Sequence, residues 1–146
     1  MARFPASIVT PERVLLDGEE VEAVILRTDA GDATFLANHT DLVGAVVPGV
    51  CRLQREDGSE VRLAVHGGFV QVGDNRVTVL APVAERAEEI DVDRAQRALE
   101  AAEARLGDAG SRTAGAGGEE EAADPELAEA AAAAERARVR IEVAGS

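Results

Sequence analysis

Residues 65–81 have the sequence VHGGFVQVGDNRVTVLA, in which two short apolar runs flank a polar turn. The runs, 68–72 and 76–80, are rich in valine, a residue that favours strands. Gly73-Asp74-Asn75 lies between them and is a turn signal of the kind that joins paired strands. The stretch therefore predicts a β-hairpin.

Toward the N-terminus, further runs of this kind are separated by turn signals about every eight to twelve residues, a spacing typical of a sandwich or barrel. The runs are 7–10, 21–26, 34–37, 50–54 and 61–65, with a turn at Asp17-Gly18 before the second, a loop at 38–41, and the turn 56–59 between the last two. In 61–65, Val61, Leu63 and Val65 share one face while Arg62 points away. Residues 1–87 are therefore predicted to form an antiparallel β-sandwich.

From Ala87 onward the period of the apolar residues becomes helical. Val92, Ala95, Ala98, Leu99, Ala102 and Leu106 recur at intervals that place them on one face of a helix. Asp91 stands at the N-cap position, where its carboxylate can accept free first-turn N–H groups. Arg105 suits the negative end of this helix, and Gly107 is expected to end it.

Residues 107–123 contain Gly, Ala, Ser and acidic residues without an apolar period, so we expect a flexible loop. Asp124-Pro125-Glu126 is then a start signal for a second helix. The apolar stripe of that helix is mostly alanine: Leu127, Ala130, Ala131, Ala134, Ala137 and Ile141. Alanine favours helix formation but buries little surface, so this helix should form easily and dock weakly. Residues 88–146 are thus predicted to be a two-helix hairpin that contains the flexible loop.

The composition excludes several classes of function. A net charge of −13 argues against nucleic acid or an anionic membrane as partner, because both need a basic surface. The single cysteine, Cys51, excludes an internal disulfide and suits the cytoplasm. No signal peptide or apolar run of about 18 residues occurs, so membrane association is expected only through a partner. The sequence has no Ser-His-Asp set, metal motif or catalytic carboxylate pair, so we expect neither catalytic nor metal-binding residues.

Several runs, in their order along the chain, resemble the epsilon subunit of bacterial F-type ATP synthases. Residues 8–12, IVTPE, resemble the opening strand and turn of that family. Residues 31–49, GDATFLANHTDLVGAVVPG, resemble its glycine turn, loop histidine and later Pro-Gly pair. Residues 65–81 resemble the strands that close the sandwich, and residues 88–106, EEIDVDRAQRALEAAEARL, the start of the helical hairpin. The resemblance covers nearly the whole chain.

The resemblance implies a non-catalytic rotor subunit in the central stalk of a proton-translocating ATP synthase. The sandwich would bind the gamma subunit and rest on the ring of membrane c subunits, with His39 at the c-ring contact. The helices would be mobile, either folded against the sandwich or extended along gamma toward the alpha and beta subunits, where they block hydrolysis. The protein would then be peripheral, on the cytoplasmic face of the bacterial cell membrane, and would require no cofactor.

Some epsilon subunits bind ATP on the folded hairpin through an Ile/Leu-Asp-x-x-Arg-Ala motif, which occurs here at residues 90–95, IDVDRA. The resemblance implies ATP as a regulatory ligand, and its candidate residues are Glu85, Ile90, Asp91, Arg94, Ala95, Arg136 and Arg140. Arginine can bind phosphates, and a carboxylate can accept hydrogen bonds from adenine or ribose. A purely structural interpretation also fits, in which Asp91 caps a helix, Arg94 is solvated, and Arg136 and Arg140 offset the negative helix end.

Two other functions stay open at this level. The chain could be a free-standing nucleotide sensor, for which the helical arginines are the whole function. It could also be a small β-sandwich enzyme that uses His39 and His66, although neither has an acidic or cysteine cluster at ligand spacing. His66 is expected to be structural, because the glycines that follow it permit close strand packing or a bulge.

Overall fold

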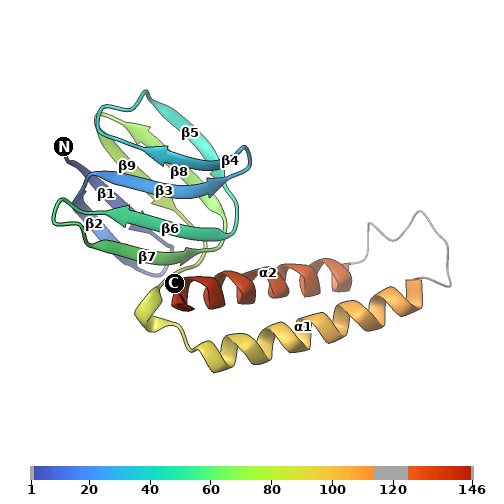
Figure 1. Cartoon of the computed structure of the whole chain (residues 1–146). Helices are drawn as coiled ribbons and strands as arrows, with labels where there is room; N and C mark the ends of the chain where they lie inside the picture. Colours follow the sequence, from blue (N-terminus) through green and yellow to red (C-terminus); the bar gives the residue numbers. More distant parts are fainter. Residues whose placement is uncertain (1, 114–124, 146) are drawn as a thin grey trace.

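The computed structural model describes residues 2–113 and 125–145, which form a β-structure followed by two helices (Figure 1). The strands are β1 (Phe4–Val9), β2 (Val14–Val21), β3 (Ala23–Thr28), β4 (Gly31–Phe35), β5 (Leu42–Val46), β6 (Gly49–Gln54), β7 (Glu60–Val65), β8 (Gly68–Gly73), β9 (Arg76–Leu80) and β10 (Ala84–Arg86). A short 3-10 helix, η1 (Ala87–Glu89), leads to the helices α1 (Val92–Thr113) and α2 (Pro125–Gly145). We call α1 and α2 the helical arm, and residues 84–91 the hinge.

The strands form one continuous sheet that folds over on itself to give the two layers of a sandwich (Figure 1). The strand order is β10-β7-β6-β3-β5-β8-β9-β1-β2, and β4 pairs with β3 beside this path. The pairs are antiparallel except β1 with β9, which run parallel. The predicted antiparallel β-sandwich is therefore confirmed, with one parallel pair in addition.

The core between the layers consists of aliphatic side chains, two phenylalanines and Cys51. In β7 the predicted alternation is present: Val61, Leu63 and Val65 belong to this core, whereas Arg62 does not. Successive side chains of a strand point to opposite faces, so the outer face of β7 carries Arg62 and Ala64. Ala64 is nevertheless fully buried, because the helical arm covers it there.

The predicted turn at Asp17-Gly18 is wrong, because both residues lie inside β2. The register with β1 shifts here, so that Asp17 and Gly18 together oppose the single residue Ser7. This arrangement is a β-bulge, and Gly18 takes a left-handed conformation (φ 66°) that glycine adopts without steric cost. The Gly18 N–H donates to Ser7 Oγ at 2.9 Å. A glycine that predicts a turn can equally predict a bulge.

The predicted set of strands lacks β2, β5 and β10. The bulge breaks the period of β2, and β10 has only three residues. In β5 Leu42 and Val43 are adjacent and both exposed, and Val46 alone is buried, so the segment shows no alternation of buried and exposed apolar residues. These strands are recognised by their pairing partners rather than by their own pattern.

The prediction that Gly107 ends the first helix is also wrong, because α1 continues through it to Thr113. A glycine inside a helix costs only about 1 kcal/mol relative to alanine, and the good helix formers of residues 101–106 before it offset that cost. An added Cβ at Gly107 would meet nothing within 4 Å, so no close contact requires glycine there. Residues 107–113 of the predicted flexible loop are therefore helical, and its remainder from residue 114 lies outside the described residues.

The second helix begins at Pro125, as its start signal predicts, and packs antiparallel against α1 (Figure 1). The predicted two-helix hairpin is therefore confirmed. Three alanines of the predicted stripe are buried, but Ala131 is exposed. Val139 and Val143, which the stripe did not include, are fully buried at the end that faces the sandwich.

Candidate functional site at the junction of the sandwich and the arm

A cleft of about 410 Å³ lies where the hinge, the first turns of α1 and the C-terminal half of α2 meet. It is lined by Glu85, Glu89, Asp91, Arg94, Ala95, Ala98 and Arg140. Three carboxylates and two guanidinium groups therefore border one space. Because these groups come from the hinge and both helices, the cleft exists only while the arm is docked.

Glu85 of β10 connects the sandwich to the arm. Its Oε1 accepts a hydrogen bond from Arg140 Nε of α2 at 2.7 Å and lies 3.0 Å from His66 Nε2. The hydrogen bond with His66 is the largest cause that lowers the pKa of Glu85 to about 2; partial burial opposes it, and Arg140 adds to the lowering. Glu85 is therefore ionised near neutral pH and offers Arg140 a fixed negative charge.

His66 follows β7, and its side chain, which is 3% exposed, lies beside Glu85. Because the ionised carboxylate can only accept, His66 Nε2 carries the proton in this contact. His66 Nδ1 is buried and has no hydrogen-bond partner in the part of the chain that the structure describes. The close strand packing expected of the following glycines is confirmed, because a Cβ on Gly68 would lie 2.0 Å from the carbonyl oxygen of Leu80.

Asp91 and Arg94 lie at the start of α1. Asp91 Oδ1 accepts the backbone N–H of Arg94 at 3.1 Å, so Asp91 caps the helix as predicted. Both residues line the cleft, and the Arg94 residue is exposed. The capping interpretation and a binding role are therefore compatible, because the cap uses one oxygen of Asp91 and none of the guanidinium of Arg94.

The other three predicted site residues take different positions. Ala95 is buried and forms part of the cleft wall. Ile90 does not line the cleft and packs instead beside Val139 and Val143 of α2. Arg136 does not line the cleft, and its Nη2 forms an ion pair with Glu129 Oε1 at 2.9 Å. The structure thus gathers Glu85, Asp91, Arg94, Ala95 and Arg140 around one space and leaves Arg136 outside it.

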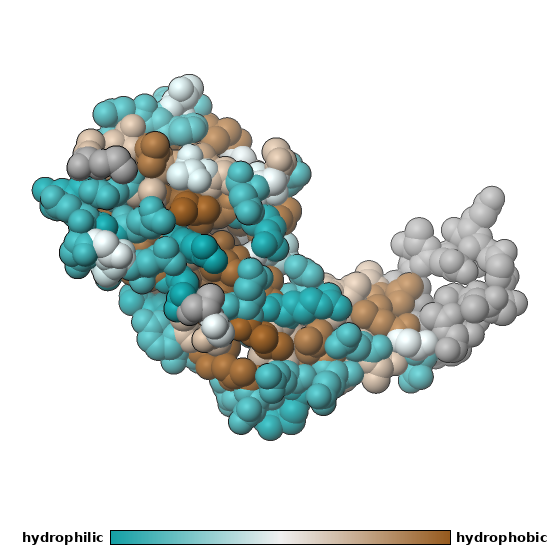
Figure 2. Space-filling model, in the orientation of Figure 1, coloured by the Kyte–Doolittle hydropathy of each residue, from teal (hydrophilic) through white to brown (hydrophobic). Residues whose placement is uncertain are grey.

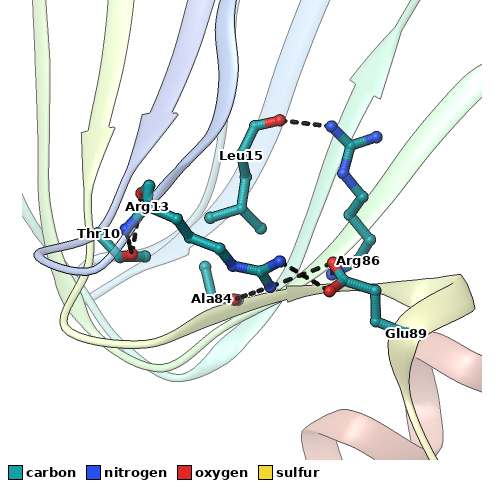
Figure 3. Close-up of polar contacts among 6 residues, drawn as sticks. All are labelled: Thr10, Arg13, Leu15, Ala84, Arg86 and Glu89. Atoms are coloured by element: carbon teal, nitrogen blue, oxygen red, sulfur yellow. Dashed lines mark hydrogen bonds and ion pairs between the residues drawn. The ribbon is translucent and has the colours of Figure 1, made fainter.

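Glu89 also lines the cleft but was not among the predicted site residues. Its carboxylate accepts hydrogen bonds from both Nη atoms of Arg13, at 2.8 and 3.2 Å (Figure 3). Arg13 lies in the turn between β1 and β2, 76 residues away in the chain. No spacing rule connects residues so distant, so only the fold reveals this pair.

Among the residues that the structure describes, a small apolar cluster joins the arm to the sandwich. Val139 and Val143 pack on Ala64, with Val50, Ala87 and Ile90 around them. Figure 2 shows apolar residues at this junction and along the helices, within a surface that is otherwise mostly hydrophilic. This apolar cluster is small for an interface between domains, and the ion pair between Arg140 and Glu85 beside it is partly exposed.

His39 lies in the loop between β4 and β5 and does not line the cleft. Its ring packs edge-on against Phe35, with ring centroids 5.0 Å apart and planes at 74°. His39 Nδ1 lies 2.7 Å from the carbonyl oxygen of Thr40, and the neighbouring Leu36 is 49% exposed. The loop thus offers a half-buried histidine and an exposed leucine, and its contact with a c ring stays a prediction.

The alternative of an enzyme built on two histidines gains no support from their positions, because His39 and His66 share none of their contacts. Within residues 2–113 and 125–145, no group of three or more His, Cys, Asp or Glu residues could hold a metal ion. Cys51 is fully buried in the core, and burial raises its pKa to about 12. None of the described helices is long and apolar enough to cross a membrane.

Two family models match consecutive parts of the chain. Residues 3–87 match the beta-sandwich domain of the ATP synthase Delta/Epsilon chain, and residues 88–145 match its long alpha-helix domain. The chain is 41% identical, over all of its 146 residues and 96% of the relative, to the ATP synthase epsilon chain of Symbiobacterium thermophilum. It is 52% identical to that of Desulforudis audaxviator over 100 residues, which are 68% of this chain and 72% of the relative. A chain in a structure of the OSCP, F1 and c-ring parts of the Euglena gracilis mitochondrial ATP synthase is similar over 100% of this chain and 83% of its own length, with a TM-score of 0.78 and 26% identity.

Proposed function

The chain belongs to the ATP synthase delta/epsilon family, and we propose that it couples proton-driven rotation to ATP synthesis and restrains ATP hydrolysis through its helical arm. Both halves of the chain match that family, so it is a non-catalytic subunit of the central stalk. The observation that carries the regulatory part is the small contact between arm and sandwich. An arm held by so little can leave and return, which is what a switch between two docked states requires.

The partner of the sandwich is the gamma subunit, and an apolar groove on the sandwich supports this assignment. The groove has a volume of about 590 Å³ and is lined by Val9, Thr10, Pro11, Gly68, Phe69, Leu80, Ala81 and Pro82. Phe69 is 59% exposed and Leu80 is 44% exposed, although they pair across β8 and β9. Large apolar side chains that share an exposed groove are typical of a protein interface.

Co-purification with gamma tests this assignment. Phe69→Asp places a charge in the groove without disturbing the core, so the variant should lose gamma while keeping its unfolding midpoint. Val92→Asp makes the same kind of change at an exposed valine of the arm, and this control should retain gamma. If Phe69→Asp still co-purifies with gamma, the groove is not the gamma interface. If the wild-type chain retains no gamma at all, the free-standing sensor becomes the better hypothesis.

The loop of His39 contacts the ring of c subunits, and this contact places the chain at the cytoplasmic face of the bacterial cell membrane. The solved Euglena gracilis relative supports this part, because its structure contains a c-ring. A His39→Cys variant should cross-link to a cysteine placed in the polar loop of the c subunit. Cys51 does not interfere, since it is fully buried. Absence of the cross-link in an assembled, active complex would rule out this contact.

The cleft at the junction binds ATP as a regulatory ligand and thereby favours the docked arm over the arm extended toward the alpha and beta subunits. Arg94 and Arg140 supply phosphate-binding guanidinium groups, while Glu85 and Asp91 supply acceptors for ribose or adenine. Ala95 forms part of the cleft wall, Ile90 packs outside the lining beside Val139 and Val143, and Arg136 joins the site only if it leaves Glu129.

Titration calorimetry with MgATP tests the site. The wild type should release heat with a Kd below about 1 mM, and Arg94→Gln or Arg140→Gln should weaken binding at least tenfold by removing a charge-assisted phosphate contact. Arg97→Gln is the control, because Arg97 is an exposed arginine of the same helix that does not line the cleft. Equal heats for wild type and both cleft variants would show that this cleft is not an ATP site.

A further inference from the structure

We propose that Arg13, a residue of the sandwich, positions the hinge of the arm and, through Glu89, sets the charge of the cleft. The hinge part stands on the contacts of the structure alone, whereas the cleft part rests on the nucleotide site proposed above. Figure 3 shows the residues involved, which come from the turn between β1 and β2, from the start of β2 and from the hinge.

The backbone of Arg13 is held in a hydrogen-bonded turn. It ends the turn 10–13, where Thr10 N and Thr10 Oγ1 donate to the carbonyl oxygen of Arg13 at 2.9 and 3.0 Å. Arg13 N donates in return to Thr10 Oγ1 at 3.1 Å, and the ring of Pro11 fixes one backbone angle of the turn. Because three hydrogen bonds close four residues, the turn fixes where the Arg13 side chain starts.

The guanidinium of Arg13 binds the hinge at two points. Nη1 and Nη2 pair with both oxygens of Glu89, at 2.8 and 3.2 Å, and Nη2 also donates to the carbonyl oxygen of Ala84 at 3.4 Å. Glu89 Oε1 in turn accepts the backbone N–H of Arg86 at 3.1 Å. The hydrogen bond from Arg13 is the largest cause that lowers the pKa of Glu89, so this carboxylate is ionised. A two-pronged pair of this kind fixes direction as well as distance.

A second arginine, Arg86, connects the hinge to β2. Arg86 Nη2 donates to the carbonyl oxygen of Leu15 in β2. Since β2 and β10 are the two ends of the strand order, these arginine contacts join sheet ends that share no ladder of hydrogen bonds in the described pairing. These contacts hold residues 84–89 on the sandwich. The arm can therefore turn only beyond them, at Ile90 and Asp91.

The same pair controls the charge of the cleft. Glu89, Glu85 and Asp91 line it with only two arginines, Arg94 and Arg140. Arg13 does not line the cleft, yet it neutralises Glu89 by binding both of its oxygens. Without Arg13, the carboxylate of Glu89 is free to turn toward Arg94 or Arg140 and compete with a phosphate for them. Arg13 is thus a positioning residue that keeps two cleft arginines available.

The test uses the full chain with Arg13→Gln, Glu89→Gln, the double variant, and Arg3→Gln as control. Arg3 forms an exposed pair with Glu56 at 3.1 Å in another part of the sandwich. Hydrogen exchange of the Arg86 and Ile90 amides, without nucleotide, reports on the hinge. Because the Arg13–Glu89 pair is partly exposed, we expect each single hinge variant to speed this exchange about fivefold, while Arg3→Gln leaves it unchanged. Unchanged exchange in Arg13→Gln overturns the hinge part.

Affinity for MgATP reports on the cleft. Arg13→Gln should bind about fivefold more weakly than Glu89→Gln, because only the former leaves the charge of Glu89 uncompensated. The double variant should match Glu89→Gln, since it lacks that charge. If Arg13→Gln binds as tightly as the double variant, the cleft part is overturned. If the wild type binds no nucleotide, the proposed site and the cleft part both fail, and the exchange rates alone still decide on the hinge.

Discussion

Replacing Val139 and Val143 by alanine is expected to release the arm from the sandwich while leaving both helices folded. The two valines are 1% and 0% exposed and form the apolar contact with Ala64. Each substitution removes two methyl groups, worth about 0.8 kcal/mol apiece, so the double variant loses about 3 kcal/mol of docking free energy. This shifts the ratio of docked to released arm by roughly 10²-fold, since 1.4 kcal/mol corresponds to a factor of ten. Alanine has a higher helix propensity than valine, so α2 itself should not unfold.

The assay is the distance between spin labels on Thr40→Cys in the sandwich and Arg97→Cys in the arm, two exposed positions. Cys51 stays unlabelled, because it is fully buried and its pKa is raised to about 12. The wild type should give one narrow distance distribution and the double variant a broad one. Val92→Ala removes the same two methyl groups from a valine that is 38% exposed, and it should resemble the wild type. A narrow, unchanged distribution in the double variant would show that these valines do not hold the arm.

Three further predictions concern stability. The pKa of Glu85 is lowered to about 2 from an ordinary value of 4.5, so its stabilising contribution is complete above about pH 4.5 and is lost as the pH falls toward 2. In urea unfolding, the difference in free energy of unfolding between wild type and Glu85→Gln should shrink over that range. Gly68→Ala should lower the free energy of unfolding by about 3 kcal/mol or more, because its Cβ would lie 2.0 Å from a backbone oxygen at φ +111°, whereas Gly58→Ala, with φ +85° in open space, should cost about 1–2 kcal/mol. Gly107→Ala should increase helicity in circular dichroism and stabilise α1 by up to about 1 kcal/mol, and a loss of helicity would contradict the continuous helix.

Much of the sandwich could be predicted because its strands show their buried face directly. Val61, Leu63 and Val65 alternate with polar or small residues, and all three face the core. β5 could not be predicted in this way, because Leu42 and Val43 are adjacent and both exposed, and pairing with β8 and β3 defines the strand. The helical arm was predictable from its period and from Pro125, but not its continuation past Gly107, because one glycine is too weak a signal to end a helix.

The candidate site could be predicted only where motif residues lie close together in the chain. Asp91 and Arg94 are three residues apart, and the helix brings them together at once. Arg136 and Arg140 share a helix face, yet only Arg140 reaches Glu85, because the docked end of α2 is the end that carries Val139 and Val143. That difference depends on which end of α2 docks on the sandwich, so the spacing of residues within the helix could not predict it.

We propose that the helical arm restrains hydrolysis while the sandwich alone maintains the coupling. This proposal is tested most directly by the rate of ATP hydrolysis of the reconstituted complex with the full chain and with a chain that lacks residues 88–146. We expect faster hydrolysis with the shortened chain, while proton-driven ATP synthesis is retained. Equal rates of hydrolysis with both chains would contradict an inhibitory arm.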